Sequence, residues 1–136
     1  DLYKYITSTV YLVMIVISSI GLMVGGVGVL NIMLVSVTER TREIGIRKAI
    51  GARQINILFQ FLVEAVTLSC SGGFIGIALG VLISAIATSA LGVPFAVPFF
   101  GIVAGFCVAV GVGLISGVYP AYKAARVDPI ISLRYE

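Results

Sequence analysis

Side chains that catalyse reactions or bind metals are scarce in this sequence. Its 136 residues contain no His, six acidic and nine basic residues, and two cysteines, Cys70 and Cys107, which lie in apolar runs. Without His or a CxxC pair the chain has no set of zinc ligands. It also lacks a Ser–His pair or an aspartate dyad for an intramembrane enzyme, and a phosphate loop of the GxxxxGKS type. We therefore expect that the chain is not itself an enzyme and holds no cofactor or metal.

Charge is concentrated in one stretch, ERTREIGIRKAIGAR, at residues 39–53. The stretch holds five of the nine basic residues and two of the six acidic ones, and it separates two apolar runs. Glu43 and Arg47 are four residues apart, in the order that favours an ion pair along a helix. A solvated loop whose charges only fix membrane topology is one interpretation. It explains the Arg and Lys residues better than the interleaved acids.

The same stretch has the pattern of a short amphipathic helix. Ile46, Ala49 and Ile50 are spaced to form an apolar stripe surrounded by charge. Gly51 then provides a helix stop. A helix over about residues 39–51 with an exposed isoleucine face favours docking to a cytoplasmic partner, and a helix on the membrane surface is the alternative.

The elements around this stretch are long and apolar enough to cross a membrane. Hydrophobic residues make up 60% of the chain and charged residues only 11%, well below the quarter or so that is typical of a soluble domain. No charge occurs in residues 65–122, which is too long for one crossing, and Pro94 and Pro98 interrupt it. We therefore predict an all-α integral membrane protein. The predicted spans cover about residues 10–37, 57–91 and 99–118.

The basic residues predict the topology of these spans. Eight of the nine lie in the connector and in the tail at residues 119–136, whereas only Lys4 lies on the opposite side. By the positive-inside rule the N-terminus is outside, and the connector and the C-terminus are cytoplasmic. An external start predicts an earlier span or a signal ahead of this segment. The basic residues flank spans and do not form a stripe with aromatics, so we expect no nucleic-acid binding.

One acidic residue, Glu64, is predicted to lie inside a span. It belongs to a polar stripe that recurs at three- and four-residue steps along the second span. A charge at that depth costs about 2.5–3.5 kcal/mol, which makes a proton or ion site one hypothesis. Pairing with a cation near the inner leaflet is the simpler one, because no second intramembrane acid completes a relay. The stripe consists of Arg53, Asn56, Gln60, Glu64, Thr67 and Ser71.

Glycines recur at four-residue steps in all three predicted spans. Small residues with this spacing let helices approach closely in lipid, where packing drives association. The pattern predicts a tight bundle or dimer and disfavours a wide polar pore. The glycines expected to pack are Gly21, Gly25, Gly72, Gly76, Gly80, Gly105, Gly113 and Gly117.

The tail after the third span carries its own signals. Pro120 predicts a break or the start of a new short helix. Asp128 and Pro129 have the pattern of a helix N-cap and first helical position. Arg126 and Arg134 are candidates for contact with a protein partner or with anionic lipid headgroups. A frayed amphipathic tail is the alternative.

Two charged motifs resemble a known family. The stretch SVTERTREIGIRKAIGARQINILFQFLVEA and the ending YPAYKAARVDPIISLRYE are similar to the C-terminal part of FtsX-like permeases, above all those of macrolide-exporter-type ABC transporters. The similarity covers about residues 31–136. Its charged motifs are specific, whereas the glycine-rich spans are not.

The resemblance implies a four-helix permease whose extracytoplasmic domain lies between its first two helices, so the spans here are the second to fourth. It also implies a homodimer bound to two cytoplasmic ATPase domains, which hold ATP and Mg, and an extracytoplasmic adaptor. The connector then corresponds to a coupling helix on the ATPase. Its contact residues would be Glu39, Arg40, Arg42, Glu43, Ile44, Gly45, Arg47, Lys48 and Gly51.

For function, the resemblance implies that ATP-driven movement is transmitted across the membrane to the extracytoplasmic domain, without substrate passing between the helices. Macrolide export, and with it antibiotic resistance, is the expected role. The alternative is a regulatory permease of the same architecture that controls cell-wall hydrolases or senses antimicrobial peptides. The ending AARVDPIISLRYE resembles the exporter branch more than the cell-division branch, so we expect export.

Overall fold

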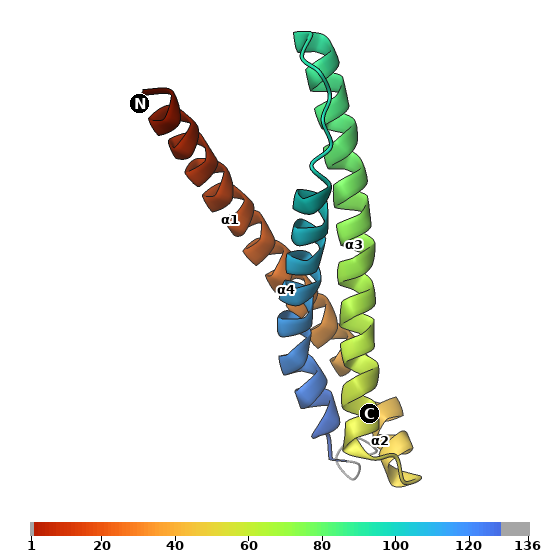
Figure 1. The fold of residues 1–136 in the computed structure, drawn as a ribbon. Helices are drawn as coiled ribbons and strands as arrows, with labels where there is room; N and C mark the ends of the chain where they lie inside the picture. Colours follow the sequence, from red (N-terminus) through yellow and green to blue (C-terminus); the bar gives the residue numbers. More distant parts are fainter. Residues whose placement is uncertain (1, 129–136) are drawn as a thin grey trace.

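The computed structural model describes residues 2–128, which form four helices and no strand (Figure 1). Three are long enough and apolar enough to cross a membrane, and the mean hydropathy of an 18-residue window reaches 2.4, 2.2 and 2.3 in α1, α3 and α4. This confirms the predicted all-α class with three membrane-spanning candidates and a short fourth helix. The helices are α1 (Leu2–Glu39), α2 (Thr41–Ala49), α3 (Gln54–Leu91) and α4 (Phe99–Ala125).

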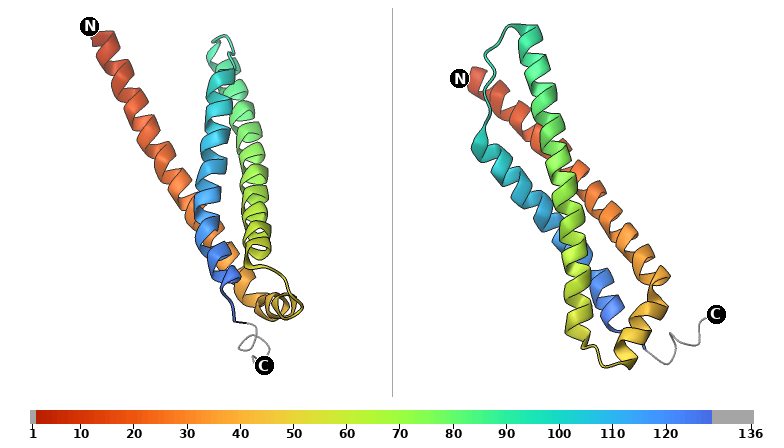
Figure 2. Two further views of the ribbon diagram at one scale, coloured as in Figure 1. Left: turned by 60° about the horizontal axis from the view of Figure 1, so that its bottom comes forward. Right: turned by 90° about the vertical axis from the view of Figure 1, so that its right-hand side faces the viewer.

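The long helices are packed at one end and spread at the other (Figures 1 and 2). The antiparallel helices α3 and α4 form the most extensive contact, and α1 packs mainly on α4. Toward its N-terminus α1 diverges from the other two. The short helix α2 lies where α1 ends, α3 begins and α4 ends. We call this region the α2 end and the opposite region the outer end.

The helices extend past the predicted spans, and the predicted break at Pro120 is wrong. Helix α4 continues through Pro120 to Ala125. Proline removes a backbone donor and normally costs a helix about 3 kcal/mol. Here its ring is fully buried, and the helix face that follows it is buried as well. Packing along this face offsets the lost hydrogen bond, as happens in membrane helices with close neighbours.

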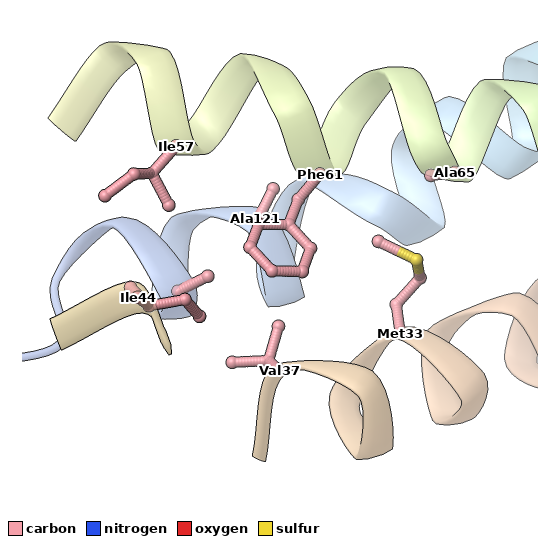
Figure 3. Close-up of a cluster of buried hydrophobic side chains, with 8 residues drawn as sticks. Met33, Val37, Ile44, Ile57, Phe61, Ala65 and Ala121 are labelled. Atoms are coloured by element: carbon pink, nitrogen blue, oxygen red, sulfur yellow. The ribbon is translucent and has the colours of Figure 1, made fainter. Parts of the chain in front are cut away.

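All four helices contribute side chains to one apolar cluster at the α2 end (Figure 3). Phe61 lies at its centre with 2% of its surface exposed, and Met33 of α1 is fully buried beside it. We call this group the inner cluster. It consists of Met33, Val37, Ile44, Ile57, Phe61, Ala65, Ala121 and Ala124.

Small residues extend this packing up the seam between α3 and α4. A Cβ atom at Gly113 would lie 1.6 Å from Ser69 Oγ, and one at Gly117 would lie 2.4 Å from Ala65 Cβ. Glycine is therefore required at both positions for the two backbones to approach this closely. Gly26 of α1 is in a similar position against α4, a contact that the GxxxG pattern does not include.

The other glycines that were expected to pack have no such contact. A Cβ atom at any of them would meet no atom within 4 Å in the described part of the chain. Most of them line an open groove of about 550 Å³ between α1 and the α3–α4 pair. Their packing against a second copy therefore stays a prediction. These positions are Gly21, Gly25, Gly72, Gly76, Gly80 and Gly105.

Candidate coupling site at the α2 end

The short helix α2 has the charge distribution that its dipole favours. Glu43 lies in its first turn, and Arg47 and Lys48 lie in its last turn. The Arg47 guanidinium also pairs with the Glu43 carboxylate one turn earlier, as the spacing predicts. After the helix, Gly51 adopts a φ of 102°, and the next amide, of Ala52, donates to the Arg47 carbonyl. The chain can therefore turn sharply toward the start of α3.

Ile44 and Gly45 were predicted to shape the contact with the partner, but both are buried against the bundle. Ile44 is 2% exposed and belongs to the inner cluster, and Gly45 is buried as well. Their burial means that they seat α2 on the bundle, and their part in shaping a partner contact stays a prediction. The isoleucine stripe lies outside: Ile46 is 44% exposed and Ile50 is 82% exposed. The apolar pattern of α2 therefore has two faces, one packed and one open.

Polar contacts connect the α2 region to α3. Arg47 Nη1 donates to Gln60 Oε1 at 2.7 Å, and Arg40 Nη1 lies 3.4 Å from Glu64 Oε2. Arg40 occupies the junction between α1 and α2. Glu64 thus has the cation partner expected from the simpler of the two hypotheses for it, and Gln60 of the same polar stripe is also used.

A lysine connects α2 to α4, which the sequence pattern did not indicate. Lys48 Nζ donates to the carbonyl oxygens of Ala125 and of Val127, the latter at 2.7 Å. A cation that binds the last carbonyls of a helix compensates the negative end of its dipole. Burial lowers the pKa of Lys48, and the charge of Asp128 opposes this shift. Lys48 therefore holds the end of α4 and is only partly exposed.

What remains accessible on α2 is a face of mixed character. Arg42 and Ala49 are exposed, the Glu43 side chain is 54% exposed, and Ile46 and Ile50 are next to them. Glu39, at the end of α1, is exposed too. Acids interleaved with bases around an apolar stripe favour a protein surface over lipid, since membrane-surface helices are rich in Lys and Arg and carry few acids. In residues 2–128 no group of three His, Cys, Asp or Glu residues is placed to hold a metal ion.

The C-terminal residues are only partly described. The Arg126 guanidinium stacks over the Tyr122 ring, 4.4 Å from its centre. Asp128 acts on Lys48 as described above. Pro129 and Arg134 lie outside the described residues, and so does the predicted helix that would begin at Asp128.

Comparison with known proteins identifies the sequence family. The FtsX-like permease C-terminal family matches residues 15–129. Over 123 residues, 90% of this chain and 17% of the relative, the sequence is 53% identical to the macrolide export ATP-binding/permease protein MacB of Syntrophobacter fumaroxidans.

Two further relatives have other names. The pyoverdine export ATP-binding/permease protein PvdT of Pseudomonas putida is 54% identical over 88% of this chain and 18% of its own length. The uncharacterized ABC transporter permease YknZ of Bacillus subtilis is 50% identical over 88% of this chain and 30% of its own length. The chain thus spans less than a third of each of these relatives.

Proposed function

The chain belongs to the FtsX-like permease family, and we propose that it is the part of an ABC-type exporter that carries ATP-driven movement from a cytoplasmic ATPase into the membrane. One observation carries the proposal. Helix α2 is tied to both α3 and α4 while its outer face stays open. A helix with this arrangement can bind a partner on one side and move the bundle with the other.

The contacts of α2 define how movement would reach the long helices. Ile44 fixes α2 in the inner cluster, Arg47 connects it to Gln60 of α3, and Lys48 connects it to the end of α4. Because packed interiors resist continuous deformation, α2 cannot shift without moving these ends. The partner ATPase holds the ATP and Mg, and this chain supplies the helices that move with it.

The spans offer little polar surface for a substrate path, which supports a mechanical role. The hydroxyl groups along α3 donate to carbonyls of their own helix: Thr67 to Val63, Ser69 to Ala65, and Thr88 to Ser84. Such bonds satisfy the hydroxyl groups locally and leave few donors for a solute. We therefore infer that cargo is handled outside the membrane, by the extracytoplasmic domain and an adaptor, in a homodimer whose connector and C-terminus face the cytoplasm.

The cargo itself is set by other parts of the protein. Relatives named for macrolide export and for pyoverdine export match this segment equally well, at 53% and 54% identity. Both names describe exporters, and this favours export over the regulatory alternative. The shared segment thus corresponds to a shared transmission device and not to a substrate site.

A pair of charge changes tests this proposal. Ile50 is 82% exposed, so Ile50→Asp removes part of the outer face of α2 without disturbing the inner cluster. Glu43→Lys reverses a charge on the same face. In the full-length protein purified with its ATPase, we expect both variants to insert normally but to lose ATPase binding or the coupling of hydrolysis to transport.

The matched control is Lys4→Glu, a charge reversal at the outer end. It should leave ATPase binding and coupling unchanged. If Ile50→Asp and Glu43→Lys behave like this control, α2 is not the ATPase contact, and the exporter mechanism proposed here is wrong.

A further inference from the structure

Beyond the coupling site, a second surface at the α2 end combines basic, aromatic and apolar side chains. Tyr119, Tyr122, Lys123 and Arg126 follow one another at steps of three, one and three residues and so share one face of α4. Together with Val127 they line a hollow of about 440 Å³. Tyr119 is 59% exposed and Tyr122 is 45% exposed.

An apolar groove adjoins this hollow and shares two of its residues. Tyr122 and Arg126 also line a groove of about 280 Å³ whose other wall is the start of α3. That wall presents Gln54 and Ile55 at the start of α3, and Leu58 one turn deeper toward the middle of the bundle. Gln54 and Arg126 therefore both lie at the ends of their antiparallel helices, and Leu58 continues the groove one turn farther into the bundle.

This order matches an anionic phospholipid, and we propose that this surface binds one. The phosphate binds Lys123 and Arg126, the tyrosine rings lie at the headgroup boundary, and an acyl chain follows Ile55 and Leu58 into the membrane. Tyr and basic residues favour this depth in membrane proteins.

Charge and geometry select the headgroup. The two hollows are lined by two cations and by no acid among the residues described. Arg126 stacks on the Tyr122 ring beside the groove and is exposed, so the edge of its guanidinium can bind two phosphate oxygens. A zwitterionic lipid would bring its own cation next to these charges, so we expect phosphatidylglycerol to bind better than phosphatidylcholine.

The inference does not depend on the proposed export function, because it concerns lipid binding alone. The test is native mass spectrometry of the full-length protein titrated with phosphatidylglycerol or phosphatidylcholine. One basic residue near an anionic lipid surface changes affinity about fivefold. We expect Lys123→Gln and Arg126→Gln each to weaken phosphatidylglycerol binding about fivefold, and the double variant roughly twenty-five-fold. Lys4→Gln, which removes the same charge at the outer end, should leave it unchanged.

A second variant separates a built site from net charge. Tyr122→Leu keeps every charge and much of the apolar volume but removes the ring under Arg126, and we expect it to weaken binding as well. Inorganic phosphate should not displace the lipid, because it cannot occupy the apolar groove.

Three outcomes would overturn the proposal. Equal losses in Lys4→Gln and Arg126→Gln would mean a net-charge effect. Displacement by inorganic phosphate would mean a phosphate site without a lipid groove. Binding that occurs only after residues 129–136 are deleted would mean that the chain itself occupies the surface.

Discussion

The two ends of this bundle contain the same kinds of residues and use them differently. At the α2 end every residue of the inner cluster is buried, and Gly113 lies directly against Ser69. Toward the outer end a Cβ atom at Gly76 would meet no atom within 4 Å among the described residues, and α1 has separated from its neighbours (Figure 1). A glycine ridge therefore does not itself indicate a packed seam. It becomes one only where a facing helix approaches closely, as α4 does at Gly26 and α3 does at Gly113.

This difference divides the molecule by role. The α2 end is fixed by apolar packing and by polar contacts of Arg40, Arg47 and Lys48, so it should move as one unit. The outer end exposes small and apolar side chains along the groove between α1 and the α3–α4 pair. The small side chains of this groove leave room for a neighbouring helix, and packing of a second copy against them stays a prediction.

The sharpest test of the comparison replaces one phenylalanine at each end by alanine. Phe61 is 2% exposed in the inner cluster, whereas Phe100, at the start of α4, is 85% exposed. Removing a buried Phe typically costs about 3–5 kcal/mol. We expect Phe61→Ala to lower the thermal stability of the full-length protein in mild detergent strongly, and Phe100→Ala to change it little. Equal effects would mean that the α2 end is not the more rigid region.

Adding volume at two glycines should give the next largest effect. Gly113→Leu forces Ser69 and the α3 backbone away from α4, and such overpacking costs about 1–3 kcal/mol or more. Gly76→Leu adds the same side chain where residues 2–128 place no atom within 4 Å of the new Cβ. We expect a lower melting temperature for Gly113→Leu only. If a second copy packs on Gly76, its variant should instead reduce the dimer fraction in crosslinking, with the fold intact.

These contrasts also show which features of the fold and of the site can be predicted from the sequence alone. Hydropathy and charge placed three membrane helices and a charged connector, because both signals come from residues close in sequence. The break expected at Pro120 was wrong because its ring is buried and the next residue, Ala121, belongs to the inner cluster, and such packing comes from residues distant in sequence. The inward orientation of Ile44 has the same cause, since its neighbours are Val37, Ile57 and Phe61.

The role of Lys48 was equally inaccessible, because it acts on carbonyls about eighty positions away along the chain. In the sequence it is one of five bases in a charged connector, and nothing there distinguishes it from Arg42. Similarly, the four-residue glycine steps do not indicate which helix each ridge faces. Contacts of this kind require the three-dimensional arrangement.

The smallest expected effect comes from Lys48, which joins α2 to α4. Lys48→Met keeps the length of the side chain but removes both hydrogen bonds to the α4 end. Hydrogen bonds of charged groups contribute about 1.5–3 kcal/mol when well shielded, and partial exposure reduces this, so we expect a loss of about 1 kcal/mol. Thermal unfolding of the full-length protein, with Lys4→Met as the exposed control, measures it. Coupling between ATP hydrolysis and transport should weaken in Lys48→Met but not in the control.

The pH dependence of the same contact has a definite sign. Burial lowers the pKa of Lys48 below its ordinary value of 10.5, so the folded protein releases this proton at a lower pH than the unfolded chain does. Between these two pKa values the unfolded state binds more protons, and the free energy of unfolding rises with pH. The stability advantage of the parent over Lys48→Met should therefore grow as the pH is raised through this window toward 10.5. A shrinking advantage would mean that attraction to Asp128 outweighs burial, and that the end of α4 is held to α2 mainly by an ion pair.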